Sequence, residues 1–106
     1  MQYTPDLWQI VKVTPVDTSK EPYFRIMACW YGGFSRGDSW KLSSGIMEIK
    51  DAGDFWEVPN HSGSVYMLHK KACGISSYGQ SVLTQLKTDS LDFVTITECE
   101  IDNVVL

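Results

Sequence analysis

Three side chains that could do chemistry lie close together in the sequence: His61, His69 and Cys73. A histidine beside a cysteine can act as base and nucleophile, and the same residue types bind zinc. A zinc site needs four such ligands at tight spacings, and these three fall short in number and pattern. No signature of a cysteine enzyme flanks Cys73. The sequence therefore predicts no metal site, no cofactor and no catalytic residue, and it favours a protein that is not an enzyme.

A second group of residues could bind phosphate. Seven of the eight glycines lie between residues 32 and 74, but neither the dinucleotide-binding nor the P-loop glycine motif is present. A looser anion site could form from the backbone N–H groups of Gly32 and Gly33, or at a helix start near Ser76 with Lys70 and Lys71 just before it. These residues support an alternative function, in which the protein binds or sequesters a small ligand such as a nucleotide signal.

The segment from Trp30 to Trp40 is rich in aromatic residues and glycines and contains an arginine and an aspartate. Such a composition is typical of a recognition loop, because aromatic rings give contact area at small entropic cost. We expect the two tryptophans to be core residues on paired strands and the residues between them to be exposed. The predicted partner-binding residues are Tyr31, Phe34, Arg36 and Asp38.

Length and charge restrict the class of protein. The 106 residues predict a single domain, residues 1–106, that can bury one core. The net charge of −4 is carried by residues 89–106, which have five acidic residues and no lysine or arginine. The remaining body is nearly neutral, which argues against nucleic acid as a partner, because such binding needs clustered basic charge. The acidic C-terminal segment could dock on a basic partner or form a solvated sheet edge.

The cysteines and the N-terminus bear on the cellular compartment. Three cysteines, Cys29, Cys73 and Cys99, suit a reducing compartment better than a disulfide framework. The first twelve residues lack the pattern of a secretory leader, and no run of apolar residues is long enough to span a membrane. We therefore expect a cytoplasmic protein that makes no membrane contact. The sequence is also compatible with a homo-oligomer.

Alternating and apolar segments separated by turn residues predict five to six strands joined mostly by short turns. Within the third of them, Gly45 is expected to form a bulge. The last residues, 101–106, could pair at a sheet edge. The predicted strands are Leu7–Val13, Tyr23–Tyr31, Ser39–Lys50, Phe55–Val58, Ser64–His69 and Leu91–Thr97.

One helix is predicted over about residues 76–88. Ser76 or Ser77 can cap its N-terminus, and Tyr78, Val82 and Leu86 form an apolar stripe at helical spacing. The predicted fold is α+β, with a mostly antiparallel sheet of about five to six strands and this helix packed on one face.

Several short motifs follow one another between residues 28 and 83. They read WYGG at 30–33, GDSWKL at 37–42, SGI at 44–46, SGSVY at 62–66 and HK at 69–70. In order and spacing these motifs resemble a group of small proteins of tailed bacteriophages. The resemblance covers about half of the chain and carries no catalytic residue across.

The resemblance implies an accessory phage protein that acts in the host bacterial cytoplasm. Small non-enzymatic phage products often occupy a host protein, so the expected function is to bind and modulate or inhibit a host protein, with antiviral defence components, as for an anti-CRISPR protein, among the candidate targets. That inference rests on association with a group of proteins rather than on a site.

Overall fold

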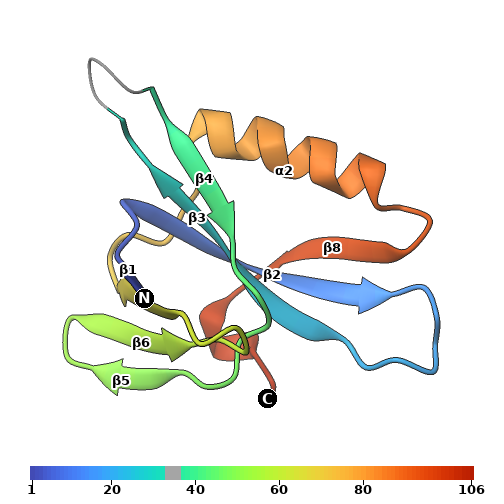
Figure 1. The fold of residues 1–106 in the computed structure, drawn as a ribbon, viewed down its shortest axis with the longest axis horizontal. Helices are drawn as coiled ribbons and strands as arrows, with labels where there is room; N and C mark the ends of the chain where they lie inside the picture. The colour runs from blue at the N-terminus through green and yellow to red at the C-terminus, as the bar shows by residue number, and fades with distance from the viewer. Residues whose placement is uncertain (33–36) are drawn as a thin grey trace.

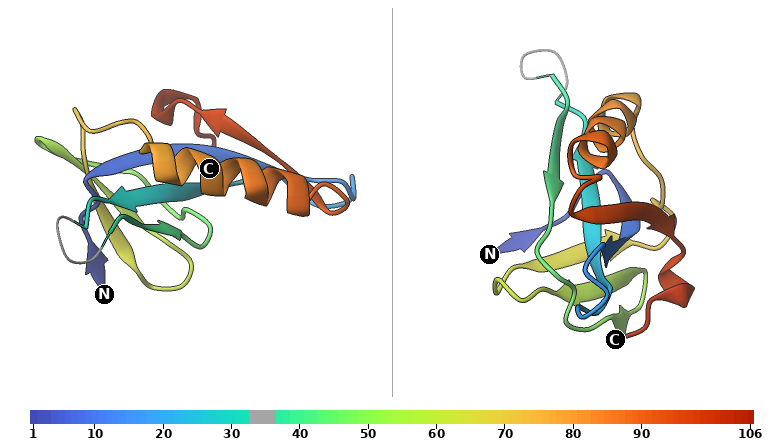
Figure 2. Two further views of the ribbon diagram at one scale, coloured as in Figure 1. Left: turned by 90° about the horizontal axis from the view of Figure 1, so that it is seen from above. Right: turned by 90° about the vertical axis from the view of Figure 1, so that its right-hand side faces the viewer.

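The computed structural model describes residues 1–32 and 37–106. In this part of the chain, eight strands and one α-helix form three layers, with two four-stranded sheets packed face to face and the helix on the outer face of one of them (Figures 1 and 2). The predicted α+β class with one packed helix is confirmed.

The sheet beneath the helix, here called the central sheet, is antiparallel throughout. Its two long inner strands are joined by the loop at residues 16–22. In spatial order its strands are β4 (Ser39–Leu42), β3 (Tyr23–Trp30), β2 (Leu7–Pro15) and β8 (Val94–Cys99).

The second sheet, here called the outer sheet, is built mostly from the middle of the chain. Its N-terminal strand pairs in parallel with β7, and the other pairs are antiparallel. A tight turn at residues 61–63 joins β6 to β7. In spatial order its strands are β1 (Gln2–Tyr3), β7 (Val65–His69), β6 (Phe55–Pro59) and β5 (Lys50–Ala52).

The two long strands of the central sheet are buried on both faces, which explains the three layers. On β2, Trp8 and Ile10 pack in the core between the sheets, while Val11 and Val13 pack in a separate core beneath the helix. A strand with apolar side chains on both faces needs a cover on each side. The helix covers one face, and the outer sheet covers the other.

The prediction of one sheet with a continuous strand over Ser39–Lys50 is wrong. Strand β4 ends at Leu42 because the next residue, Ser43, turns inward, is 2% exposed, and accepts a hydrogen bond from the backbone N–H of Ile26 at 2.8 Å. The chain then crosses to the outer sheet, where strand β5 begins at Lys50. Residues expected to continue one strand therefore connect two sheets.

Helix α2 (Ser77–Asp89) confirms the predicted helix and its cap. The Ser76 hydroxyl accepts a hydrogen bond from the backbone N–H of Gly79 at 3.0 Å. The buried positions of the helix are Gly79 and Leu83, one turn apart. Tyr78, expected on the apolar stripe, is 45% exposed. The helix instead packs against β3 through Gly79, which has no side chain and so allows a close approach.

The C-terminal segment differs from its prediction in two places. Residues 91–93 form a turn after the helix, so strand β8 begins at Val94 rather than at Leu91. Residues 101–106 do not pair at an edge; they form the 3₁₀ helix η1 (Ile101–Asn103) and an extended tail. Ile101 and Val104 instead pack against the core between the sheets, which gains more apolar contact than an edge position.

No helix in the described part of the chain has the length and apolar character needed to cross a membrane.

The buried Tyr66 hydroxyl gives a prediction for alkaline pH. Tyr66 is 1% exposed, and its hydroxyl has no hydrogen-bond partner among the described residues. Burial raises the pKa of Tyr66 to about 12, above the value of about 10 in an unfolded chain. Since the folded state holds the proton more tightly, its contribution to stability is complete below pH 10 and is lost between pH 10 and about 12.

Tyr66→Phe is expected to reduce the decrease in the free energy of unfolding between pH 10 and about 12. At pH 7 the variant should unfold with a free energy that is unchanged or raised by about 1 kcal/mol, because it removes a buried unpartnered hydroxyl. Urea unfolding at a series of pH values measures both effects. A clear loss of stability at pH 7 would mean that the hydroxyl has a stabilising partner.

Candidate functional site

The described residues of the predicted recognition segment, 30–32 and 37–40, lie at the end of β3 and the start of β4, which project from the body of the molecule (Figure 1). The backbones of Gly32 and Gly37 approach each other closely. A Cβ atom at Gly32 would overlap the carbonyl oxygen of Gly37, and Gly37 has a φ of 63°. Glycine at these positions therefore allows this close approach and the positive φ. We call the described residues beside this contact, 30–32 and 37–40, the hairpin base.

The N-terminal segment fixes the hairpin base in place. The backbone N–H of Tyr31 donates to the Asp6 carboxylate at 2.8 Å, and the indole N–H of Trp30 donates to the carbonyl of Thr4 at 3.2 Å. The backbone N–H of Asp6 in turn donates to the carbonyl of Cys29 at 3.0 Å. These three hydrogen bonds hold the backbone at the end of β3 before any partner binds.

Aromatic side chains at the hairpin base are accessible to solvent. Tyr31 is 59% exposed, and Asp38 is also exposed. A hollow of about 630 Å³ lies beside Tyr31. The described residues that line it are Trp30, Tyr31, Gly32, Gly37 and Ser39.

The two tryptophans do not behave alike. Trp30 is half-buried and packs against the core between the sheets, as expected of a scaffold residue. Trp40, also predicted to be core, is 37% exposed. It pairs with Cys29 across β3 and β4, and β4 is the edge strand of the central sheet, so among the described residues Trp40 has a paired strand on one side only.

Three of the predicted site residues, Gly33, Phe34 and Arg36, lie outside the described residues. Their predicted roles in binding stay predictions. The site is therefore built here from Tyr31, Asp38 and the residues that hold them.

The residues predicted for a phosphate site are distributed over different parts of the fold. The Lys70 ammonium contacts the Asp51 carboxylate at 2.6 Å and lies 4.4 Å from the centre of the Trp56 ring, both on the outer sheet. Gly32 belongs to the central-sheet hairpin instead. Ser76 is 4% exposed, and its hydroxyl caps the helix. Lys71 is exposed.

His69 and Cys73 were the candidate base and nucleophile. The Nδ1 atom of His69 accepts a hydrogen bond from the backbone N–H of Lys71 at 3.1 Å. Burial, and then the nearby Glu100 carboxylate, raise the pKa of the Cys73 thiol, which keeps it protonated at neutral pH. Among the described residues, no group of histidine, cysteine, aspartate or glutamate side chains could hold a metal ion.

The supporting residues at the hairpin base were missed by the sequence reasoning. Tyr3 packs edge-on against Trp30, with ring centroids 6.2 Å apart, and the Lys41 ammonium lies 5.2 Å from the centre of the Tyr3 ring. Together with Asp6, these residues couple the N-terminus to the hairpin. No local motif marks Asp6, because its contact with Tyr31 joins positions far apart in the sequence.

Comparison with known proteins gave no match to a family model, a curated protein or a solved structure.

Proposed function

We propose that this chain is a non-enzymatic phage accessory protein that binds and modulates or inhibits a bacterial host protein through the hairpin base. The phage setting and the class of target rest on the resemblance of the WYGG, GDSWKL and SGSVY motifs alone. Binding of a protein partner through the hairpin base is supported by the geometry there.

The observation that carries the proposal is the position of Tyr31. Its ring is 59% exposed while its own backbone N–H is held by the Asp6 carboxylate. An exposed aromatic ring on an ordered backbone loses little further entropy on binding, and tyrosine combines apolar area with a hydrogen-bonding hydroxyl. Trp40 and Asp38 beside it extend the apolar and polar parts of the same surface.

The alternative of a nucleotide-binding protein has weaker support. Lys70 already contacts a carboxylate and an aromatic ring, and the Ser76 hydroxyl caps a helix. A phosphate group would have to displace these contacts. The geometry thus favours a protein partner over a phosphate-bearing ligand.

Variants of Tyr31 and Asp6 test the proposal. In a bacterial host that expresses the tagged protein, Tyr31→Ala is expected to abolish co-purification of a stoichiometric host protein, because it removes the exposed anchor. Asp6→Ala is expected to weaken capture about tenfold while leaving the Tyr31 ring in place, because it releases the backbone. Affinity purification with mass spectrometry, followed by a titration with the purified partner, measures both.

Met47→Ala provides the matched control, since Met47 is also an exposed large apolar residue, at 54%, but lies away from the hairpin. All three variants should melt within a few degrees of the parent protein. Equal capture by the parent and by Tyr31→Ala would contradict the proposal. A rise in melting temperature with a panel of nucleotides, without any captured protein, would support the alternative function.

A further inference from the structure

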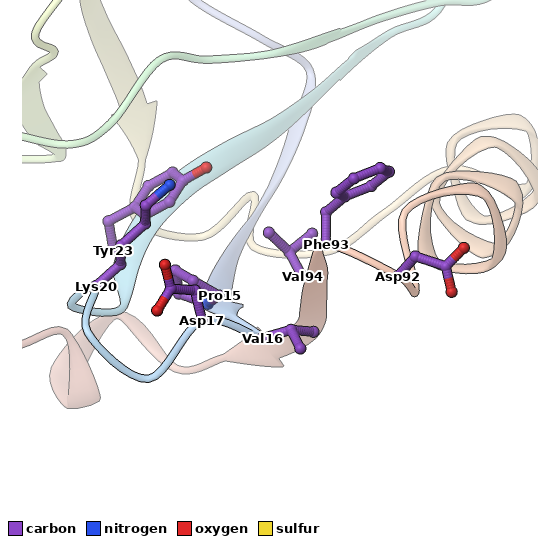
Figure 3. Close-up of a pocket in the computed structure, with 8 residues that line it drawn as sticks. All are labelled: Pro15, Val16, Asp17, Lys20, Tyr23, Asp92, Phe93 and Val94. Carbon is purple, nitrogen blue, oxygen red and sulfur yellow. The ribbon is translucent and has the colours of Figure 1, made fainter.

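A groove opens where the β2–β3 loop meets the turn between α2 and β8 (Figure 3). It lies at the other end of β3 from the hairpin base (Figure 1). The groove has a volume of about 490 Å³, which is within the range of ligand-binding pockets. Its apolar lining consists of Pro15, Val16, Tyr23, Phe93 and Val94.

Phe93 is held in position although its side chain is 73% exposed. Its backbone N–H donates to the carbonyl of Ser90 at 2.9 Å, and its own carbonyl accepts the N–H of Val16 at 2.9 Å. The Tyr23 ring, 40% exposed, lies on the other side of Val94 in Figure 3. Two aromatic rings are thus presented on ordered backbone around an apolar floor.

The charges in the groove favour a cation. The lining contains the carboxylates of Asp17 and Asp92 and the single ammonium of Lys20. The Ser19 hydroxyl and backbone N–H donate to the Asp17 carboxylate at 2.7 and 3.0 Å. These hydrogen bonds lower the pKa of Asp17, so its carboxylate is ionised at neutral pH.

The C-terminal end of helix α2 adds to the negative potential. The last carbonyl groups of a helix carry partial negative charge, and Asp92 lies close to this end of the helix in Figure 3. The basic residue of the last turn, Lys87, is already paired with Glu98, at 2.6 Å. A cation in the groove would therefore meet the Asp17 and Asp92 carboxylates and the aromatic rings of Tyr23 and Phe93, which attract it.

We propose that this groove binds a segment of another protein that carries an arginine or lysine next to a large apolar side chain. The cationic group lies over the Tyr23 ring on the side of the groove that carries Asp17, or over the Phe93 ring on the side that carries Asp92 (Figure 3). The apolar side chain packs against the aliphatic floor, where Val16 is 55% exposed. This surface is separate from the hairpin base, and its binding does not depend on the function proposed there.

Short peptides test the chemistry of the groove directly. The probe is an acetylated and amidated hexapeptide of alternating arginine and leucine, added to the isotope-labelled full chain at up to about 1 mM. Two matched peptides replace either every arginine by glutamate or every leucine by glycine. The arginine–leucine peptide is expected to shift the backbone amide signals of Val16, Tyr23 and Val94 and to bind at least about tenfold more tightly than either matched peptide.

Variants separate the contributions of the ring and the charge. Phe93→Ala is expected to weaken binding about tenfold. The double variant Asp17→Asn/Asp92→Asn is expected to weaken peptide binding and to make the affinity less dependent on salt concentration. Asp102→Asn, an exposed carboxylate in η1, and Met47→Ala, an exposed apolar residue outside the groove, serve as controls and should bind as the parent does. All replaced residues are exposed, so the fold should be retained.

Four results would overturn the proposal. If the glutamate peptide bound as tightly as the arginine–leucine peptide, the carboxylates of the groove would not determine binding. If the amide shifts were confined to another surface, the peptide would not bind in the groove. No binding at the highest peptide concentration would remove the site. Concentration-dependent self-association that shifts the same amide signals without peptide would show that a second copy of this chain occupies the groove instead.

Discussion

Trp8→Ala is expected to lower the free energy of unfolding by about 4 kcal/mol. Trp8 is 1% exposed and lies on the inner face of β2, in the core between the two sheets. Its indole N–H donates to the carbonyl of His69 on β7 at 2.8 Å, so one side chain joins the central sheet to the outer sheet. Removing it leaves a cavity and an unpaired carbonyl group at the same place.

The backbone of Trp8 also holds the segment that leads into helix α2. Its N–H donates to the carbonyl of Ala72 at 3.1 Å, and its carbonyl accepts the N–H of Gly74 at 2.7 Å. Because a domain of this size is stable by only about 5–15 kcal/mol, the variant should lose a large part of its stability. Urea unfolding followed by circular dichroism measures the loss as a lower midpoint at a similar slope.

Two further variants calibrate this result. Trp8→Phe keeps the ring and removes the N–H, so it should lose about 1–2 kcal/mol. Trp40→Ala removes the same side chain from the edge strand, where it is 37% exposed, and should lose much less than Trp8→Ala. If Trp8→Ala and Trp40→Ala proved equally stable, the face-to-face packing of the two sheets would be wrong.

Local patterns predicted the elements well where one segment contains its own start and stop signals. Ser76 followed by apolar residues at helical spacing predicted helix α2, and turn residues on both sides predicted β6 and β7. The apolar run over Tyr23–Tyr31 predicted a strand, and the residues of this run are mostly apolar on both faces. That pattern already implied a cover on both faces, which the one-sheet prediction did not provide.

The errors arose where tertiary contacts decide. The chain leaves β4 after Leu42 because Ser43 finds a backbone partner on β3, and no local pattern distinguishes this from a bulge. The exposure of Tyr31 was predicted from composition, but its fixation by Asp6 joins residues from two distant parts of the sequence. Phe93 was assigned to a strand, although it lies in the turn that displays it in the groove.

The hairpin base and the groove share one structural feature. At each, an exposed aromatic ring sits on a backbone that is hydrogen-bonded to another segment: Tyr31 to Asp6, and Phe93 to Ser90 and Val16. The long inner strand β3 connects them, with its last residue at the hairpin base and its first residue, Tyr23, in the groove. A protein with both surfaces occupied would hold two partners at opposite ends of one sheet.

Gly79→Ala is expected to lower the free energy of unfolding by about 2 kcal/mol, even though alanine favours helix formation by about 1 kcal/mol over glycine. A Cβ atom at this position would lie 2.5 Å from the Sγ atom of Cys29 and 3.0 Å from Ile75. Cys29 is 1% exposed on β3, so its side chain has little room to move. The helix would have to lift away from the central sheet.

Removal of the Cys29 sulfur should relieve this overlap. Variants of Cys29 and Gly79 together therefore test how the helix packs on β3. Cys29→Ala alone leaves a small cavity and should lose about 1 kcal/mol. The double variant Cys29→Ala/Gly79→Ala should be more stable than Gly79→Ala alone, with a coupling of about 1–2 kcal/mol. Ser81→Ala, at an exposed position of the same helix, controls for helix propensity and should change stability by less than about 0.5 kcal/mol. Additive losses would mean that the helix does not rest on Cys29, and the helix would then give the end of β3 no support from beneath.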